Sequence, residues 1–120
     1  MNRWADEDAL WGFLAPRLRG WWRRLEVVQP EGLPDSFGLF DNRVHWLELK
    51  LGKPGLKAFR PKQLEFAHEC IKRGISWHVV FGHKSDVMFY AFPDCSTAIT
   101  PGFWLTPPER LHASVERARR

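Results

Sequence analysis

The sequence lacks several features that would place it in a common class. Its 120 residues contain only two cysteines, Cys70 and Cys95, which excludes a scaffold built on several disulfides. No stretch approaches the ~18 consecutive apolar residues of a membrane-spanning helix, and the acidic run Asp6-Glu7-Asp8 argues against a signal peptide. We therefore expect an intracellular, cytoplasmic protein with no membrane partner.

The motifs of several enzyme classes are missing as well. There is no phosphate-binding loop, no nucleophile elbow and no glycine-rich dinucleotide fingerprint, so NTP hydrolysis, acyl transfer and an organic cofactor have no support. The five histidines lack the spacing of a His-Glu-x-x-His zinc motif. Together with Cys70 and Cys95 they leave a zinc site open as an alternative to buried or surface histidines.

The composition is that of one globular domain. Hydrophobic residues make up 44% and charged residues 27%, a balance that argues against wholesale disorder. The 18 Lys and Arg exceed the 14 Asp and Glu and give a net charge of +4, which fits a polyanionic partner without establishing one. We expect a core over about residues 5–92 and a C-terminal extension over 93–120.

Hydrophobic periodicity predicts an α/β fold with a mixed central sheet flanked by helices. Helical patterns cover Asp6–Ala15 and the segment from Pro61 to Arg73, where Gly74 is the stop signal, and Leu64, Ala67 and Ile71 form the expected buried stripe. A short terminal helix is expected after Pro107-Pro108. The strand patterns are Arg24–Val28 (or a last helical turn), Ser36–Phe40, Arg43–Leu51, Ile75–Phe81 and Val87–Phe92.

The predicted hairpin over residues 36–51 brings two acids together. With a two-residue turn at Asp41-Asn42, Asp35 lies opposite Glu48 with Cβ atoms ~4.5–5.5 Å apart. Lys50 points to the same side because residues two apart share a face of a strand. Two like charges directly opposite each other are destabilising unless a cation lies between them, one is protonated or both reach solvent.

Such a pair suits a hard divalent cation. Mg²⁺ binds carboxylate and carbonyl oxygens and keeps several waters, and it can clamp a phosphate and lower the pKa of a bound water. Lys50 beside it can orient the attacking water or stabilise charge on the phosphorus. The alternative interpretation is an exposed strand end where Glu48 and Lys50 are solvated charges.

Basic and aromatic residues add candidate binding surfaces. The segment from Lys50 to Lys62 contains no acid, and we expect its exposed cations to bind DNA phosphates, although a merely solvated loop has the same composition. These cations are Lys53, Lys57, Arg60 and Lys62. Among the seven tryptophans, Trp46 and Trp77 are expected in the core, whereas Trp11 and the pair Trp21-Trp22 are candidates for a partner surface.

The order of these motifs resembles that of a nuclease superfamily. Gly32-Leu33-Pro34-Asp35, followed after twelve residues by Glu48-Leu49-Lys50, resembles the PD-(D/E)XK nucleases. The resemblance extends from about Arg24 to Val80 and is closest to the virus-type replication-repair branch, the VRR-NUC domains. The further matching segments are Arg24-Leu25-Glu26, Arg60-Pro61-x-Gln63 and Gly74-x-x-Trp77-x-Val79-Val80.

The resemblance implies a helix, three antiparallel strands, a second helix and a further strand, with DNA cleavage that depends on Mg²⁺ or Mn²⁺. The matching site residues are Asp35 and Glu48 as metal-binding acids, Leu49 through its backbone carbonyl, Lys50 as catalytic lysine, Gln63 from the second helix, and Glu26 as upstream acid, with Glu31 as its competitor.

The sequence therefore predicts a small DNA endonuclease that hydrolyses phosphodiester bonds. The branch implies branched substrates such as Holliday junctions, in replication, recombination or repair, and cleavage of two strands suggests a homodimer. A phage origin fits the branch and would place the protein in the host cytoplasm. A nuclease for flaps, nicks or duplex DNA and a non-catalytic DNA-binding module on the same fold are the alternatives.

Overall fold

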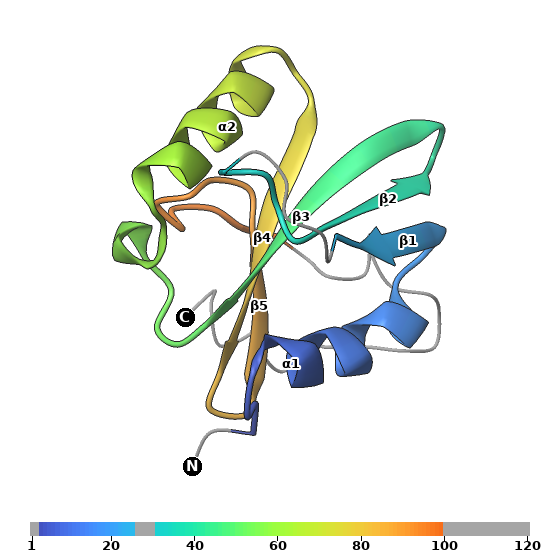
Figure 1. Cartoon of the computed structure of the whole chain (residues 1–120), viewed down its shortest axis with the longest axis vertical. Coiled ribbons are helices and arrows are strands. Elements are labelled where there is room, and N and C mark those ends of the chain that lie inside the picture. The colour runs from blue at the N-terminus through green and yellow to red at the C-terminus, as the bar shows by residue number, and fades with distance from the viewer. Residues whose placement is uncertain (1–2, 26–30, 100–120) are drawn as a thin grey trace.

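In the part of the chain that the structure describes, six strands form one mixed sheet with a helix packed on each face (Figure 1). The computed structural model describes residues 3–25 and 31–99. Within this part of the chain no helix is long and apolar enough to cross a membrane. The elements are α1 (Glu7–Leu14), η1 (Ala15–Arg17), β1 (Trp21–Arg24), β2 (Ser36–Phe40), β3 (Arg43–Leu51), η2 (Leu56–Ala58), α2 (Pro61–Lys72), β4 (Ser76–His83), β5 (Asp86–Tyr90) and β6 (Ala98–Ile99).

The strands lie in the order in which they occur along the chain, from β1 to β6. Only β3 and β4 run parallel, and the other neighbours are antiparallel. The parallel pair follows from the connection, because a chain that leaves β3 must cross over before it can run alongside in the same direction, and α2 provides that crossover. The expected α/β class with a mixed sheet is confirmed.

The β2–β3 hairpin has the bounds, turn and register that the sequence predicts. Asp41 and Asn42 both have φ of 58°, as a two-residue turn that follows the strand twist requires. Phe40 pairs with Arg43 and Phe37 with Trp46. The turn therefore determines which side chains of β2 and β3 share a face, without any contact with a helix.

The two helices predicted before residue 75 form, with identifiable ends. The Oδ1 atom of Asp6 accepts a hydrogen bond of 2.8 Å from the Ala9 N–H and caps the start of α1. The helix ends at Leu14 and is followed by η1, which contains Pro16. Pro61 is the first residue of α2, and Gly74, with φ of 72°, reverses the chain after its last turn.

Some local expectations differ from the structure. The strand that pairs with β2 is Trp21–Arg24, because Gly20, with φ of 85°, turns the chain early enough for Trp21 to pair with Leu39. Most of the expected strand Arg24–Val28 lies outside the described residues. The fifth strand ends at Tyr90 instead of Phe92. The buried stripe of α2 is Gln63, Ala67 and Cys70, so Ala67 lies in it as expected. Cys70, expected beside the stripe, lies in it, whereas Leu64 and Ile71 are only partly buried. The expected terminal helix lies outside the described residues.

Two apolar clusters separate the sheet from its helices. On the α1 face, Leu10 and Leu14 pack against Leu47 and Leu49 of β3. On the α2 face, Ala67 and Cys70 pack with residues of β4 and β5. The expected burial of Trp77 is confirmed, since only 3% of its surface is exposed. These clusters fix α1 and α2 on opposite sides of β3, the strand that carries the candidate site.

Candidate active site

Asp35 lies where β2 and β3 stop pairing. The last β2–β3 pair is Ser36 with Leu47, so the next backbone groups of β3 have no strand partner on that side. The Oδ2 atom of Asp35 accepts a hydrogen bond of 3.0 Å from the Leu49 N–H, and its backbone oxygen accepts one of 2.7 Å from the Leu25 N–H. The carboxylate thus substitutes for the missing strand and is held between β1 and β3.

Packing explains the glycine and the proline of the Gly-x-Pro-Asp motif that ends at Asp35. Gly32 has φ of 100°, and a Cβ at this position would overlap the backbone carbonyl of Lys62 in the first turn of α2. Only glycine combines this conformation with such a close approach. Pro34 is fully buried. The motif therefore brings the chain entering β2 against the start of α2, beside Gln63.

Glu48 is a buried carboxyl group in direct contact with Asp35. Only 2% of its surface is exposed, and its side chain hydrogen-bonds to that of Asp35. Burial first, and then the hydrogen bond and charge of Asp35, raise the pKa of Glu48 to about 10, against an opposing effect of Lys50. The Glu48 carboxyl therefore holds a proton at neutral pH. The expected convergence of the two acids is observed.

Lys50 and Gln63 form a second contact beside the acids. The Lys50 Nζ atom donates to Gln63 Oε1 at 3.0 Å, and the same oxygen accepts from the Arg60 N–H at 2.8 Å. The ammonium lies 5.3 Å from the centre of the Phe59 ring. Gln63 is buried, so its carbonyl oxygen fixes the ammonium by a short contact in a site with little solvent. The burial of Gln63 on the sheet side of α2 brings it within reach of Lys50.

Glu7 in the first turn of α1 belongs to the same electrostatic group. Burial, and after it the charge of Asp35, raises the pKa of Glu7, while Lys50 and Arg24 lower it. Its two neighbours have other roles, because Asp6 caps the helix and Asp8 forms an ion pair with Arg24. In the sequence all three acids match a helix N-terminus equally well, so no local signal distinguishes Glu7.

Of the two upstream acids named from the sequence, Glu26 lies outside the described residues and Glu31 is exposed. The roles predicted for Asp35, Glu48, Lys50 and Gln63 in catalysis stay predictions. What the structure adds is their proximity, together with that of Glu7. Four segments far apart in sequence supply these groups, namely α1, the residue before β2, β3 and α2.

The oxygen donors of this site suit a hard divalent ion. Besides the two acids, the backbone carbonyl of Leu49 could bind a metal. The N–H and C=O of one strand residue point to the same side of the strand, and the Leu49 N–H points to Asp35, beyond the last β2–β3 pair. Within residues 3–25 and 31–99 no three His, Cys, Asp or Glu side chains gather into a metal-binding group. Two carboxylates and a carbonyl fit Mg²⁺, which retains several waters, and do not fit four-coordinate zinc.

The zinc alternative finds no ligand set among the described histidines either. His45 is buried, and both of its ring nitrogens are hydrogen-bonded, Nδ1 with Ser76 Oγ at 2.7 Å and Nε2 with the Phe40 carbonyl at 3.0 Å. Burial lowers the pKa of His45, as expected for a neutral ring that joins β2, β3 and β4. His45 is a structural residue of the sheet.

The predicted DNA-binding cations are all exposed. Lys53 and Lys57 lie between β3 and α2, and Arg60 and Lys62 lie at the start of that helix. Lys62 is within 4.0 Å of Glu65 on the next turn. The four cations thus all lie on the segment that connects Lys50 to Gln63.

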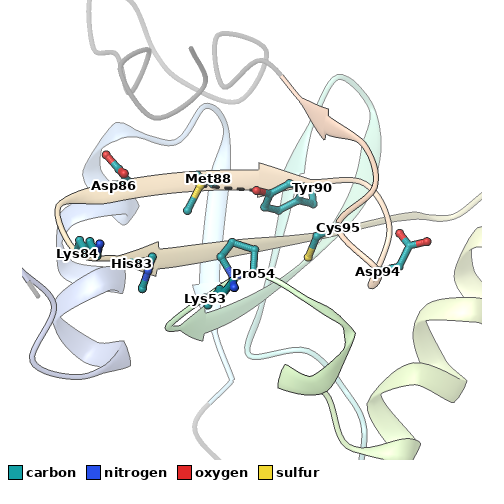
Figure 2. A pocket seen from close by; sticks show the side chains of 9 residues that line it. All are labelled: Lys53, Pro54, His83, Lys84, Asp86, Met88, Tyr90, Asp94 and Cys95. Carbon is teal, nitrogen blue, oxygen red and sulfur yellow. Dashed lines mark hydrogen bonds between the residues drawn. The ribbon is translucent and has the colours of Figure 1, made fainter. Parts of the chain in front are cut away.

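Lys53 also borders a hollow of about 500 Å³ over the β4–β5 hairpin (Figure 2). Its floor contains Met88 and Tyr90, and His83 and Lys84 lie near the end of the hairpin. Neither the carboxylate pair nor Lys50 and Gln63 line this hollow. It is therefore a surface feature separate from the candidate active site.

Comparison with known proteins adds no assignment. No model of a known protein family matches the chain, and no curated protein matches it.

Proposed function

We propose that this protein is a DNA endonuclease dependent on Mg²⁺ or Mn²⁺, built on the PD-(D/E)XK fold and closest to its VRR-NUC branch. The observation that carries the proposal is the contact between the Asp35 and Glu48 carboxyls at the point where β2 leaves β3, with Lys50 held by Gln63 beside it. The ordered motifs that contain these residues support the same conclusion.

Asp35, Glu48 and the Leu49 carbonyl would hold the metal, which supplies polarisation of the scissile phosphate and a more acidic water. Glu48 must first lose the proton that its raised pKa retains. Without a cation, two adjacent buried carboxyl groups resist ionisation of both. A bound cation would therefore stabilise this pair more than it would stabilise an exposed pair.

The other groups act directly on the reacting atoms or position those that do. Lys50 places a positive charge where negative charge grows on the phosphate during attack, and the Gln63 oxygen keeps it there. Glu7 adds a partly buried acid near the pair, positioned to influence the protonation of Glu48. No organic cofactor is required by this arrangement.

Exposed cations on the segment between Lys50 and Gln63 would give the DNA a surface to bind. Lys53, Lys57, Arg60 and Lys62 would contact phosphates of the DNA backbone. One site cuts one strand, so paired cuts in branched DNA, such as a Holliday junction, would use a homodimer. Flaps, nicks and duplex DNA are the alternative substrates.

The test is cleavage of four-way-junction, flap, nicked and linear DNA with Mg²⁺, Mn²⁺ or EDTA. We expect cleavage with either metal, none with EDTA, and the highest rate on the junction. Binding of metal by the free protein should release protons, and its affinity should rise with pH, since Glu48 is protonated at neutral pH. DNA binding without cleavage under any metal condition would indicate a non-catalytic module instead.

Replacing Gln63 tests how Lys50 is positioned. In Gln63→Leu we expect the cleavage rate to fall about tenfold while KM changes little, because the lost contact orients a group that acts in the transition state. The matched control is His68→Leu on the exposed face of α2. A Gln63→Leu rate equal to wild type in single-turnover assays would exclude this role.

A further inference from the structure

An exposed apolar row crosses three strands near the candidate site. Trp21 of β1, Leu39 of β2 and Val44 of β3 are successive cross-strand partners, with 44%, 44% and 46% of their surfaces exposed. In Figure 1 this end of the sheet extends away from α2.

The row shares its face with the carboxylate pair. Leu39 and Asp35 are four residues apart, as are Val44 and Glu48, which places the row ~13 Å from the acids along the strands. Phe37 and Trp46 lie between, with ring centres 5.8 Å apart. A stacked DNA strand covers this distance in about four nucleotides at ~3.4 Å each.

The guanidinium group of Arg23 lies over the ring of Trp21. The guanidinium carbon of Arg23 lies 4.1 Å from the ring centre, and the edge of Trp21 meets Phe37 with centres 6.0 Å apart. Arg23 is exposed and is fixed further by a hydrogen bond of 2.8 Å to the Trp22 carbonyl. The indole and the guanidinium together present flat surfaces on which a base can stack, and a positive charge that attracts phosphate.

We propose that Trp21 and Arg23 form a stacking site for an unpaired base of the DNA substrate, about four nucleotides from the cleaved bond. The proposal rests on the proposed nuclease function and refines its substrate class, since fully paired duplex has no base to offer. Paired bases are stacked on each other, whereas bases at forks, flaps and junctions can leave the stack.

A nucleobase fits this surface better than a protein partner. A stable protein interface buries ~800 Å² on each side, far more than three side chains can present when each is less than half exposed. Trp22, the second half of the tryptophan pair predicted to form a partner surface, is buried in the α1 cluster and only 8% exposed. The outward Trp22 carbonyl already accepts from Arg23, which makes the β1 edge a poor place to add a strand.

The experiment compares binding of a forked DNA with single-stranded thymidine arms to binding of the fully paired duplex, with Ca²⁺ in place of Mg²⁺. For Trp21→Ala we expect about tenfold weaker binding of the fork and a change below about twofold for the duplex. Trp21→Phe should restore most of the fork binding because it keeps a ring. Leu39→Ala, which removes apolar surface from the same row without removing a ring, should bind like wild type.

The proposal is overturned if Trp21→Ala binds the fork like wild type, if both DNAs lose affinity equally, or if sedimentation shows that the variant has converted a dimer into a monomer. Cleavage with Mg²⁺ is measured separately on the same proteins. Cleavage without any dependence on Trp21 keeps the nuclease and removes the stacking site. Binding that depends on Trp21 without cleavage keeps the stacking site and removes the nuclease.

Discussion

Asp35→Asn should abolish metal-dependent cleavage, with a rate at least about 100-fold below wild type. The substitution keeps the size of the side chain but removes one of the two negative charges that would bind the cation. Its amide oxygen can still accept from the Leu49 N–H, so the fold should persist. Single-turnover cleavage of junction DNA, with Mg²⁺ affinity from calorimetry, measures both effects.

Asp41→Asn is the matched control for this variant. Asp41 lies in the turn of the same hairpin, is exposed and has φ of 58°, a conformation that asparagine adopts readily. It undergoes the same chemical change at a position away from the acids, so its cleavage rate should equal that of wild type. Wild-type turnover by Asp35→Asn, or equal losses in the two variants, would contradict the assignment of the metal site.

Glu48→Gln should lose cleavage to a similar extent and yet gain stability above neutral pH. The gain follows from the raised pKa of Glu48, which is about 10 in the folded protein and about 4.5 in the unfolded chain. Between these values the folded state binds more protons, so stability of the wild type declines as the pH rises. Glutamine has no proton to lose, keeps the size of the side chain and has no such decline.

The measurement is the free energy of unfolding by urea at pH 4 and pH 8 without metal. Near pH 4, below the pKa of the unfolded chain, the glutamate is neutral in both states and the two proteins should be nearly equal. At pH 8 we expect Glu48→Gln to be about 1–2 kcal/mol more stable. Glu65→Gln, an exposed position on α2, should follow the wild-type profile. A variant less stable than wild type at pH 8 would refute the buried, protonated state of Glu48.

A gain in stability on losing Glu48 would fit a side chain kept for function rather than for folding. A buried acid beside another acid weakens the fold, and in the proposed function the same arrangement would prepare the pair for a cation. Lys50 offsets only part of this cost, since the net shift of the Glu48 pKa remains upward. The structure thus provides a stability measurement that tests the site without any DNA.

Short-range signals in the sequence were sufficient for the hairpin and for three of the predicted site residues. The turn at Asp41-Asn42 sets which residues face each other, and alternation sets the face. Asp35 and Glu48 therefore converge whatever packs on the sheet, and Lys50 follows two residues later. Pro61 and Gly74 likewise bracket α2 by backbone chemistry alone.

Only the tertiary structure shows which side chains of α1, α2 and β1 lie near the carboxylate pair or on the exposed row. Glu7 differs from Asp6 and Asp8 only in the direction it takes once α1 has packed on the sheet. Gln63 is buried where α2 packs on the sheet and there contacts Lys50, and the start of β1 at Trp21 goes with its pairing with β2. Local pattern determined the carboxylate pair because its partners are joined by one turn, whereas Glu7, Gln63 and the exposed Trp21 depend on contacts between segments that no local period encodes.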